Sequence, residues 1–256
     1  MLSKKENTNE IVTNLQKYWN YRAKSYSESN IEELNNFKGE AWLKILLKNA
    51  PNKKKLKVLD VGAGPGLFSI LMALAGHEVT AVDISSEMIK SARENAKSFN
   101  VNVNFVQVDG IELPFEDKSF DFIISRNVLW NLEYPKEALK EWKRLLDEDG
   151  HLLYFDANQY LHLFKEENSK RYDEDMKNME KIFGYKEVKT KEVENLEKVA
   201  KKLVLSKEER PSWDIKALKE CGYNFIKVEE DMGRYVLDER QKVEQKSRPL
   251  FMVLAK

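Results

Sequence analysis

The chain has 256 residues, of which 42% are hydrophobic, and its 43 Lys and Arg residues balance its 43 Asp and Glu residues. This length suffices for one sizeable core with an added segment, and the balanced charge argues against a large nucleic-acid or anionic-membrane surface. The single cysteine, Cys221, excludes an intrachain disulfide. No apolar run is long enough for a membrane span and the first residues lack a signal-peptide core. We therefore expect a soluble cytoplasmic protein, and no metal, since the histidines show no ligand spacing.

Residues 8–50 carry apolar side chains at helical spacing and predict two helices, with a break near residues 27–30. The first of these helices contains Tyr18, Trp19, Arg22 and Tyr26. An amphipathic helix that packs its aromatic residues onto the rest of the protein explains this pattern. Direct contact of these residues with a ligand is the alternative.

Residues 56–69 contain the most informative pattern of the chain, an apolar strand that ends at Asp60 and continues into Gly62, Gly64 and Gly66. An amphipathic helix follows the glycines. Glycine lets a backbone approach a ligand closely and adopt angles that a side chain forbids, and the free N–H groups of the helix start face the same place. The pattern predicts a small-molecule site at this turn.

Two further strands also end in carboxylates. The strand over residues 78–82 ends at Asp83, where a carboxylate can accept hydrogen bonds from both hydroxyls of a ribose; a helix N-cap shared with the following serines is the alternative. The strand over residues 103–108 ends at Asp109, which can contact a ligand or serve only as a turn residue. We expect both carboxylates to lie beside the glycine turn.

The alternation of strands and helices continues with a strand at residues 122–125, a helix at 135–147 that stops at Asp149-Gly150, and a strand at 152–155. This order is typical of a parallel sheet with crossover helices. Residues 158–210 are instead highly charged with a helical pattern. A further helix over residues 212–221 and two strands complete the chain, and we interpret Cys221 as a small apolar residue near a helix end.

The motifs, in this order, resemble the class I S-adenosylmethionine (SAM)-dependent methyltransferases, in particular the type 11-like subgroup that acts on small molecules. The family pattern is D-x-G-x-G-x-G, an acidic residue after the second strand, and D-x-x-x-L-P-F followed by S-F-D. It corresponds here to residues 60–66, Asp83, 109–115 and 119–121. The resemblance covers roughly residues 50–157. It implies an α/β fold with a Rossmann-like, seven-stranded, mostly parallel sheet, helices on both faces and a final antiparallel strand pair.

The resemblance also implies four segments. Residues 1–50 form an N-terminal helical segment, 51–157 the SAM-binding core, 158–210 a helical cap inserted after strand five, and 211–256 the C-terminal part of the core. The family segment W-x-x-R-A-x-x-Y, which closes over SAM, matches Trp19, Arg22 and Tyr26.

SAM carries a sulfonium, a ribose, an adenine and an amino-acid tail, and each part needs a different partner. An aromatic ring beside the sulfonium gains cation–π attraction, and Arg22 can pair with the carboxylate of the tail. The residues implied to hold the cofactor are Tyr18, Arg22, Tyr26, Asp60, Gly62, Ala63, Gly64, Gly66, Asp83, Ile84, Met88, Asp109, Gly110, Ile111, Arg126 and Asn127.

Residues 125–132 and 155–162 follow predicted strands, at the crevice where open α/β sheets bind ligands. The candidates for contact with the methyl acceptor are Trp19, Trp130, Asp156, Asn158, Tyr160 and His162. Asp156 or His162 can act as a general base, although positioning alone can carry methyl transfer because the sulfonium leaves as a neutral thioether. A core position is an equally good interpretation of Trp130.

The sequence therefore predicts an enzyme that moves a methyl group from SAM to an O, N, S or C atom of a small molecule and releases S-adenosylhomocysteine (SAH). Two alternatives stay open. A non-catalytic SAM-binding or interaction module could use the charged segment for a partner. An NAD(P)-dependent oxidoreductase shares the ribose-binding acid, but the glycine spacing and the D-x-x-x-L-P-F segment argue against it. We expect no nucleic-acid or membrane partner.

Overall fold

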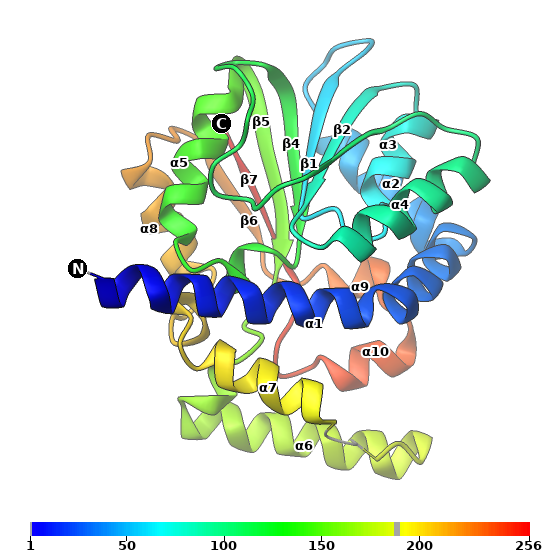
Figure 1. Ribbon diagram of the computed structural model, residues 1–256. Coiled ribbons are helices and arrows are strands. Elements are labelled where there is room, and N and C mark those ends of the chain that lie inside the picture. Colours follow the sequence, from blue (N-terminus) through cyan, green and yellow to red (C-terminus); the bar gives the residue numbers. More distant parts are fainter. Residues whose placement is uncertain (1, 187–189) are drawn as a thin grey trace.

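The computed structural model describes residues 2–186 and 190–256, and the side chains from residue 10 onward within those ranges. Seven strands form one twisted sheet in the order β3-β2-β1-β4-β5-β7-β6 (Figure 1). Strand β7 runs antiparallel to both of its neighbours, β5 and β6. The strands are β1 (Lys57–Val61), β2 (Glu78–Asp83), β3 (Asn104–Gln107), β4 (Phe120–Arg126), β5 (Leu146–Asp156), β6 (Ile226–Glu229) and β7 (Phe251–Ala255).

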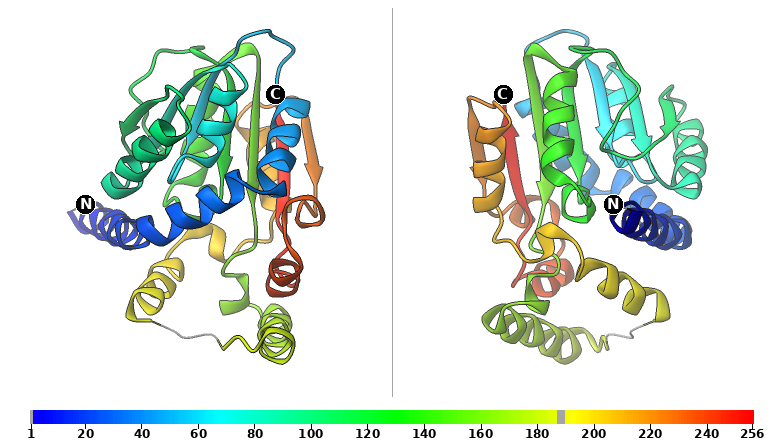
Figure 2. Two further views of the ribbon diagram at one scale, coloured as in Figure 1. Left: turned by 90° about the vertical axis from the view of Figure 1, so that its right-hand side faces the viewer. Right: turned by 60° about the vertical axis from the view of Figure 1, so that its left-hand side comes forward.

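Helices cover both faces of this sheet, so its central strands are apolar on both sides (Figure 2). The helices are α1 (Leu2–Leu34), α2 (Phe37–Asn49), α3 (Leu67–Leu74), α4 (Ser86–Ser98), α5 (Pro135–Leu145), α6 (Glu166–Phe183), α7 (Lys191–Ala200), α8 (Ser212–Glu220), α9 (Gly233–Val236) and α10 (Glu239–Glu244). One core cluster joins α5 and α8 to the sheet, and a second joins α2 and α3 to the opposite face. Three short 3₁₀ helices, η1 (Leu129–Asn131), η2 (Leu161–Leu163) and η3 (Val204–Ser206), lie in the connections.

The N-terminal segment differs from the prediction, because α1 continues through residues 27–30 and ends only at Leu34. Polar residues suggested a break there, but two of them have tertiary partners. Ser27 and Asn95 of α4 exchange hydrogen bonds, and the buried Asn30 accepts one from Arg126. The second helix begins instead at Phe37, after the N-cap Asn36, whose side chain accepts a hydrogen bond from the Lys38 N–H.

The prediction that Asp149-Gly150 ends a helix is also wrong. Helix α5 ends at Leu145, and β5 begins with Leu146, which is paired with Phe120 across an irregularity in the ladder. Gly150 therefore lies within a strand. The antiparallel pairing of the last two strands is confirmed by the register of β6 with β7.

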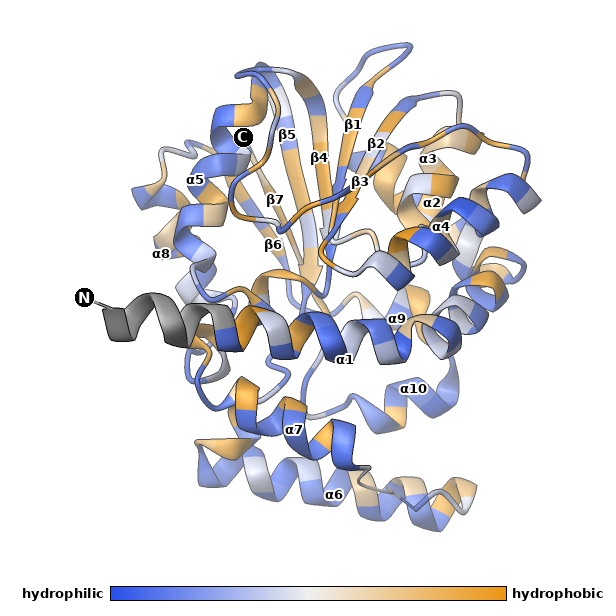
Figure 3. Ribbon diagram, in the orientation of Figure 1, coloured by the Kyte–Doolittle hydropathy of each residue, from blue (hydrophilic) through white to orange (hydrophobic). Residues whose placement is uncertain are grey.

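Within residues 158–210, the described parts include α6, α7 and the short helices η2 and η3, which lie beyond the carboxyl ends of the strands, with α1 between α7 and the sheet (Figure 1). Most residues of α6 are hydrophilic (Figure 3). A hydrogen bond of 2.7 Å from the Ser247 N–H to the buried Asp175 carboxylate ties α6 to the segment before β7. None of the described helices combines the length and apolar composition needed to cross a membrane.

Candidate functional site: two adjoining cavities

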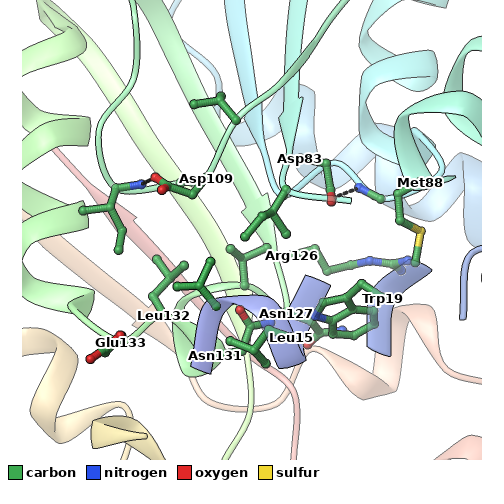
Figure 4. A pocket seen from close by; sticks show the side chains of 18 of the residues that line it. Leu15, Trp19, Asp83, Met88, Asp109, Arg126, Asn127, Asn131, Leu132 and Glu133 are labelled. Carbon is green, nitrogen blue, oxygen red and sulfur yellow. Dashed lines mark hydrogen bonds between the residues drawn. The ribbon is translucent and has the colours of Figure 1, made fainter. Parts of the chain in front are cut away.

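A cavity of about 820 Å³ opens at the carboxyl ends of β1, β2 and β4, where α1 passes beneath them (Figure 4). We call it the glycine-loop cavity. It is lined by Val12, Leu15, Trp19, Tyr26, Gly62, Gly64, Asp83, Ile84, Met88, Val108, Asp109, Gly110, Ile111, Arg126, Asn127, Val128, Asn131, Leu132 and Glu133.

The glycine turn brings backbone, without side chains, to the wall of this cavity. Gly62 and Gly64 have positive φ angles of +66° and +54°, and a Cβ on Gly62 would lie 2.2 Å from Cγ2 of Val128. A larger residue at position 62 would therefore both strain the backbone and displace Val128. Gly66 does not line the cavity. It starts α3 with a φ of +93° and packs near Ala92, so the structure gives it a folding role instead of the predicted ligand contact.

Asp83 links the second strand to the glycine turn. One carboxylate oxygen accepts the Gly64 N–H and the other accepts the Ser85 N–H, both at 2.8 Å. Burial raises the pKa of Asp83 to about 6, although the backbone donors oppose the shift. Each oxygen keeps a lone pair for a further donor. The helix-capping role belongs to Ser85, whose hydroxyl accepts the Met88 N–H at 3.0 Å.

Asp109 closes a turn and also lines the glycine-loop cavity. Its carboxylate accepts the Ile111 N–H at 3.0 Å and so closes a turn, and the exposed side chain also lines the cavity. Figure 4 shows Asp109 and Leu132 on one side of the cavity and Asp83 and Met88 on the other. The apolar predicted residues Ile84, Met88 and Ile111 line it as well.

A small recess beside the glycine turn contains Asp60 and Arg126. Asp60 is 2% exposed and accepts a hydrogen bond of 2.6 Å from the Ser69 hydroxyl. Burial raises the pKa of Asp60 to about 7, against the lowering effects of Ser69 and the Arg126 charge. Arg126 pairs with Glu33 at 2.8 Å and lies over the rings of Trp42 and Phe68.

The sequence indicated the Arg126 backbone as a ligand contact, whereas its side chain forms the basic wall of the recess. Tyr26, Asn30 and Ala63 complete that wall. Asn30 and Glu33 were not predicted, and polar residues on the buried face of an N-terminal helix were the only available signal.

Asn127 stands at the exit of β4 with a φ of +59°. Its N–H donates to the Phe155 carbonyl at 2.8 Å. Its side-chain Oδ1 is buried and has no hydrogen-bond partner among the described residues. A buried acceptor without a partner costs about 1–3 kcal/mol, so this atom is suited to a ligand.

A second cavity, of about 980 Å³, adjoins the first and shares Trp19, Tyr26 and Asn127 with it. We call it the aromatic cavity. It is lined by Tyr18, Trp19, Arg22, Tyr26, Asn127, Trp130, Gln159, Tyr160, His162, Tyr172, Met176, Tyr185, Val193, Leu196, Glu197, Glu244 and Arg248. Tyr18 and Arg22, predicted to hold the cofactor, line only this cavity, and Arg22 donates to the Tyr18 hydroxyl at 3.3 Å.

Of the predicted acceptor contacts, four line the aromatic cavity: Trp19, Trp130, Tyr160 and His162. The Trp130 side chain is 5% exposed in a cluster with Leu196, as a core position requires, and it also lines the aromatic cavity. The His162 ring stacks on Tyr172 with centroids 4.2 Å apart.

Asp156 and Asn158 are corrections to the prediction. Asp156 is fully buried, and its oxygens accept from the Arg210 guanidinium at 2.6 Å, the Trp130 N–H at 3.0 Å and the Ala157 N–H at 2.9 Å. The Asn158 side-chain amide donates to the Arg210 carbonyl and accepts a hydrogen bond from the Arg210 N–H. Neither residue lines the glycine-loop cavity or the aromatic cavity. Asp156 therefore holds the chain after β4 and cannot act as a base on an acceptor in this arrangement.

Several cavity residues had no local sequence signal, among them Tyr172, Tyr185 and Arg248. They come from helices and connections far apart in the chain. The described residues contain no group of three or more His, Cys, Asp or Glu side chains placed to hold a metal ion.

Part of the chain is similar to known proteins. Residues 59–154 match the family model of a methyltransferase domain. The demethylmenaquinone methyltransferase of Staphylococcus aureus (strain MRSA252) is 35% identical over 123 residues, which are 47% of this chain and 51% of that protein. The chain thus spans about half the length of the curated relatives it matches.

Two solved structures extend the likeness over most of the fold. A putative S-adenosyl-L-methionine-dependent methyltransferase from Methanococcus maripaludis has a TM-score of 0.58 at 20% identity, covering 93% of this chain and 92% of that one. A SAM-dependent methyltransferase from Thermotoga maritima, described as a possible histamine N-methyltransferase, has a TM-score of 0.57 at 17% identity, covering 93% and 99%.

The fold predicted from the sequence is confirmed, with its Rossmann-like, mostly parallel sheet. Residues 59–154, which match the family model of a methyltransferase domain, span this fold from β1 to β5.

Proposed function

We propose that the protein is a SAM-dependent methyltransferase that acts on a small molecule. The observation that carries this proposal is the junction of the two cavities at Trp19, Tyr26 and Asn127. A methyl donor in the glycine-loop cavity and an acceptor in the aromatic cavity would meet at that junction. The arrangement is that of a group-transfer enzyme, in which two molecules must be held in contact.

The side chains of the glycine-loop cavity fit the parts of SAM. Asp83 is suited to the ribose hydroxyls, Ile84 and Met88 to the faces of the adenine, and Asp109 with the neighbouring backbone to its polar edge. The recess with Arg126 offers a cation for the carboxylate of the amino-acid tail. These assignments agree with the predicted cofactor residues except for Gly66, Tyr18 and Arg22.

When bound, SAM would supply a methyl group on its positively charged sulfur. A lone pair of the acceptor would form the new bond to the methyl carbon while the electron pair of the C–S bond returns to sulfur, so that SAH remains. Trp19 and Tyr26 present aromatic rings at the junction, where they can stabilise a positive charge and exclude water. His162 remains the candidate for taking a proton from the acceptor, because its ring lines the aromatic cavity.

We infer that residues 158–210 act as a cap. Tyr172 and Met176 of α6 and Val193 and Leu196 of α7 supply part of the wall of the aromatic cavity. The apolar face of α7 packs onto α1 near Leu15. The segments 1–50, 51–157 and 211–256 then provide the helical N-terminus and the two parts of the core.

The name of the Staphylococcus aureus relative, demethylmenaquinone methyltransferase, is that of an enzyme acting on a small molecule. This favours a small-molecule acceptor over a macromolecule. A cytoplasmic location stays a prediction from the sequence.

The test is a calorimetric titration with SAH and, in parallel, with NADH. We expect micromolar binding of SAH, no signal with NADH, and at least about tenfold weaker SAH binding by Asp83→Ala, since a charge-assisted hydrogen bond contributes about 1.5–3 kcal/mol. Asp149→Ala is the matched control, because Asp149 is exposed and outside both cavities.

Three other outcomes contradict the proposal. Absence of SAH binding by the parent protein removes its basis, and binding of NADH favours an oxidoreductase. SAH binding without turnover of a broad acceptor panel favours the non-catalytic module.

A further inference from the structure

Two aromatic walls bound the aromatic cavity. The first belongs to α1, where Tyr18 meets Trp19 edge-on with ring centroids 5.1 Å apart and Tyr26 lies 6.1 Å from Trp19. The second continues from Trp130 to Tyr160, with centroids 5.2 Å apart. Aromatic rings offer large apolar faces that favour other planar rings in stacked or edge-on contact.

The second wall extends through His162 to Tyr172 and ends at Arg248. His162 lies 6.0 Å from Tyr160 and stacks on Tyr172 with an interplanar angle of 6°. The guanidinium carbon of Arg248 lies 5.2 Å from the centre of the Tyr172 ring. One end of this aromatic wall therefore carries a fixed positive charge.

Arg248 has unused hydrogen-bonding capacity. The carboxylate of Glu244 lies 3.9 Å away, beyond the usual length of a charge-assisted hydrogen bond. The Arg248 Nε is buried and has no hydrogen-bond partner among the described residues. A buried donor without a partner is unfavourable, whereas a planar guanidinium can bind a carboxylate through two parallel hydrogen bonds.

Other charged groups also line the cavity. Arg22 donates to the Tyr18 hydroxyl, and Glu197 and Glu244 belong to the lining as well. The Tyr172 ring, a face that could attract a cationic ligand, already has Arg248 over it and His162 stacked on it. The two aromatic walls and the Arg248 guanidinium therefore suit a ligand that has both a planar ring and an anionic group.

We propose, on the basis of the proposed function, that the methyl acceptor is a planar aromatic compound that carries a carboxylate. Its ring lies between the α1 wall and the Trp130–Tyr160 wall, and its carboxylate binds Arg248. The group that receives the methyl lies toward Asn127, where the two cavities join.

The test measures binding to the full chain saturated with SAH, so that methyl transfer is not needed. The probes are 4-hydroxybenzoate, its methyl ester, 4-hydroxycyclohexanecarboxylate and tyramine, which separate the roles of the carboxylate, the planar ring and the sign of the charge. We expect 4-hydroxybenzoate to bind at least about tenfold more tightly than each of the other three.

The variant Arg248→Gln tests the residue itself. We expect it to bind 4-hydroxybenzoate and the methyl ester within about twofold of each other, while its affinity for SAH stays that of the parent. Arg248→Lys keeps the positive charge but lacks the two parallel N–H donors of a guanidinium, so it should recover only part of the preference for 4-hydroxybenzoate over the ester. Arg234→Gln is the control, because that side chain pairs with Glu229 on the surface, outside both cavities.

The results separate two failures. If the parent does not bind SAH, the proposed function fails. If SAH binds but the ester, the saturated acid or tyramine binds as tightly as 4-hydroxybenzoate, or Arg248→Gln keeps the preference with SAH affinity intact, the acceptor class is wrong and the proposed function stands.

Discussion

At the scale of single residues, buried carboxyl groups set the electrostatics of the cofactor side of the site. Asp60 lies within the core beside the glycine turn, and burial raises its pKa from the usual 3.8 to about 7. The folded state therefore binds the Asp60 proton more tightly than the unfolded chain does. The stability that this proton contributes is complete below about pH 4 and is lost as the pH rises through 7.

Asp60→Asn tests this effect. An amide keeps an oxygen that can accept the Ser69 hydrogen bond but never ionises. We expect the free energy of unfolding of the variant, relative to the parent, to rise between pH 4 and pH 7, by up to about 1.4 kcal/mol per pH unit. Urea unfolding at a series of pH values measures it. A difference between the two proteins that is constant over this range would show that Asp60 stays ionised.

The glycines show how a motif combines two kinds of constraint. The sequence predicted that Gly62, Gly64 and Gly66 would all serve a ligand. The structure places the first two at the cavity and gives the third to the start of α3. A positive φ is common to all of them, so backbone conformation alone does not distinguish a ligand contact from a helix start.

At the scale of elements, α1 connects the two cavities. Val12, Leu15, Trp19 and Tyr26 recur at spacings that place them on one face of a helix, and all of them line the glycine-loop cavity. The same helix contributes Tyr18 and Arg22 to the aromatic cavity. It packs against α4 and α7, and it lies across the carboxyl ends of the strands (Figure 2).

Hydrogen exchange with and without SAH tests whether α1 closes over the cofactor. We expect the amides of residues 12–26 to exchange at least about tenfold more slowly with SAH bound, because a ligand in contact with this face stabilises the docked helix. Helix α5 is the internal control, since its buried face packs into the core and none of its residues lines either cavity. Equal slowing of α1 and α5 would indicate global stabilisation instead of closure.

At the scale of the whole molecule, a buried ion network fastens the end of the proposed cap to the core. The Arg210 guanidinium is fully buried between Asp156 of β5 and Asp214 of α8. The hydroxyl of Tyr154 also donates to Asp214 at 2.7 Å. Because Asp156 accepts the Trp130 N–H, the network also holds one wall of the aromatic cavity.

Arg210→Met tests the network. The substitution leaves two buried carboxylates without their cation, and we expect a loss of about 3–5 kcal/mol in the free energy of unfolding. Adding Asp156→Asn and Asp214→Asn should recover part of this loss, because the uncompensated charges are then removed. Arg171→Met is the control, since Arg171 and its partner Glu167 are both exposed and such surface pairs contribute about 1 kcal/mol or less. An equal loss in the two single variants would contradict the structural role.

The sequence by itself determined the class of fold and placed the predicted cofactor residues at one edge of the sheet. Apolar strands, the glycine turn and the acids that follow the strands are local patterns, and their chemistry depends on neighbours in the chain. For this reason the local patterns sufficed to assign Asp60, Gly62, Asp83 and Asp109 to one edge of the sheet.

Tertiary structure alone decided the acceptor side. Asp156 ends β5 as Asp83 ends β2. The carboxylate of Asp156 is nevertheless paired with the buried Arg210, which is more than fifty residues away in the chain. Arg248 and Tyr172 acquire their place only when α6 docks near the end of the chain. A local pattern shows which groups a residue carries, but the burial and partners that decide whether those groups are free for a ligand come from contacts between distant segments.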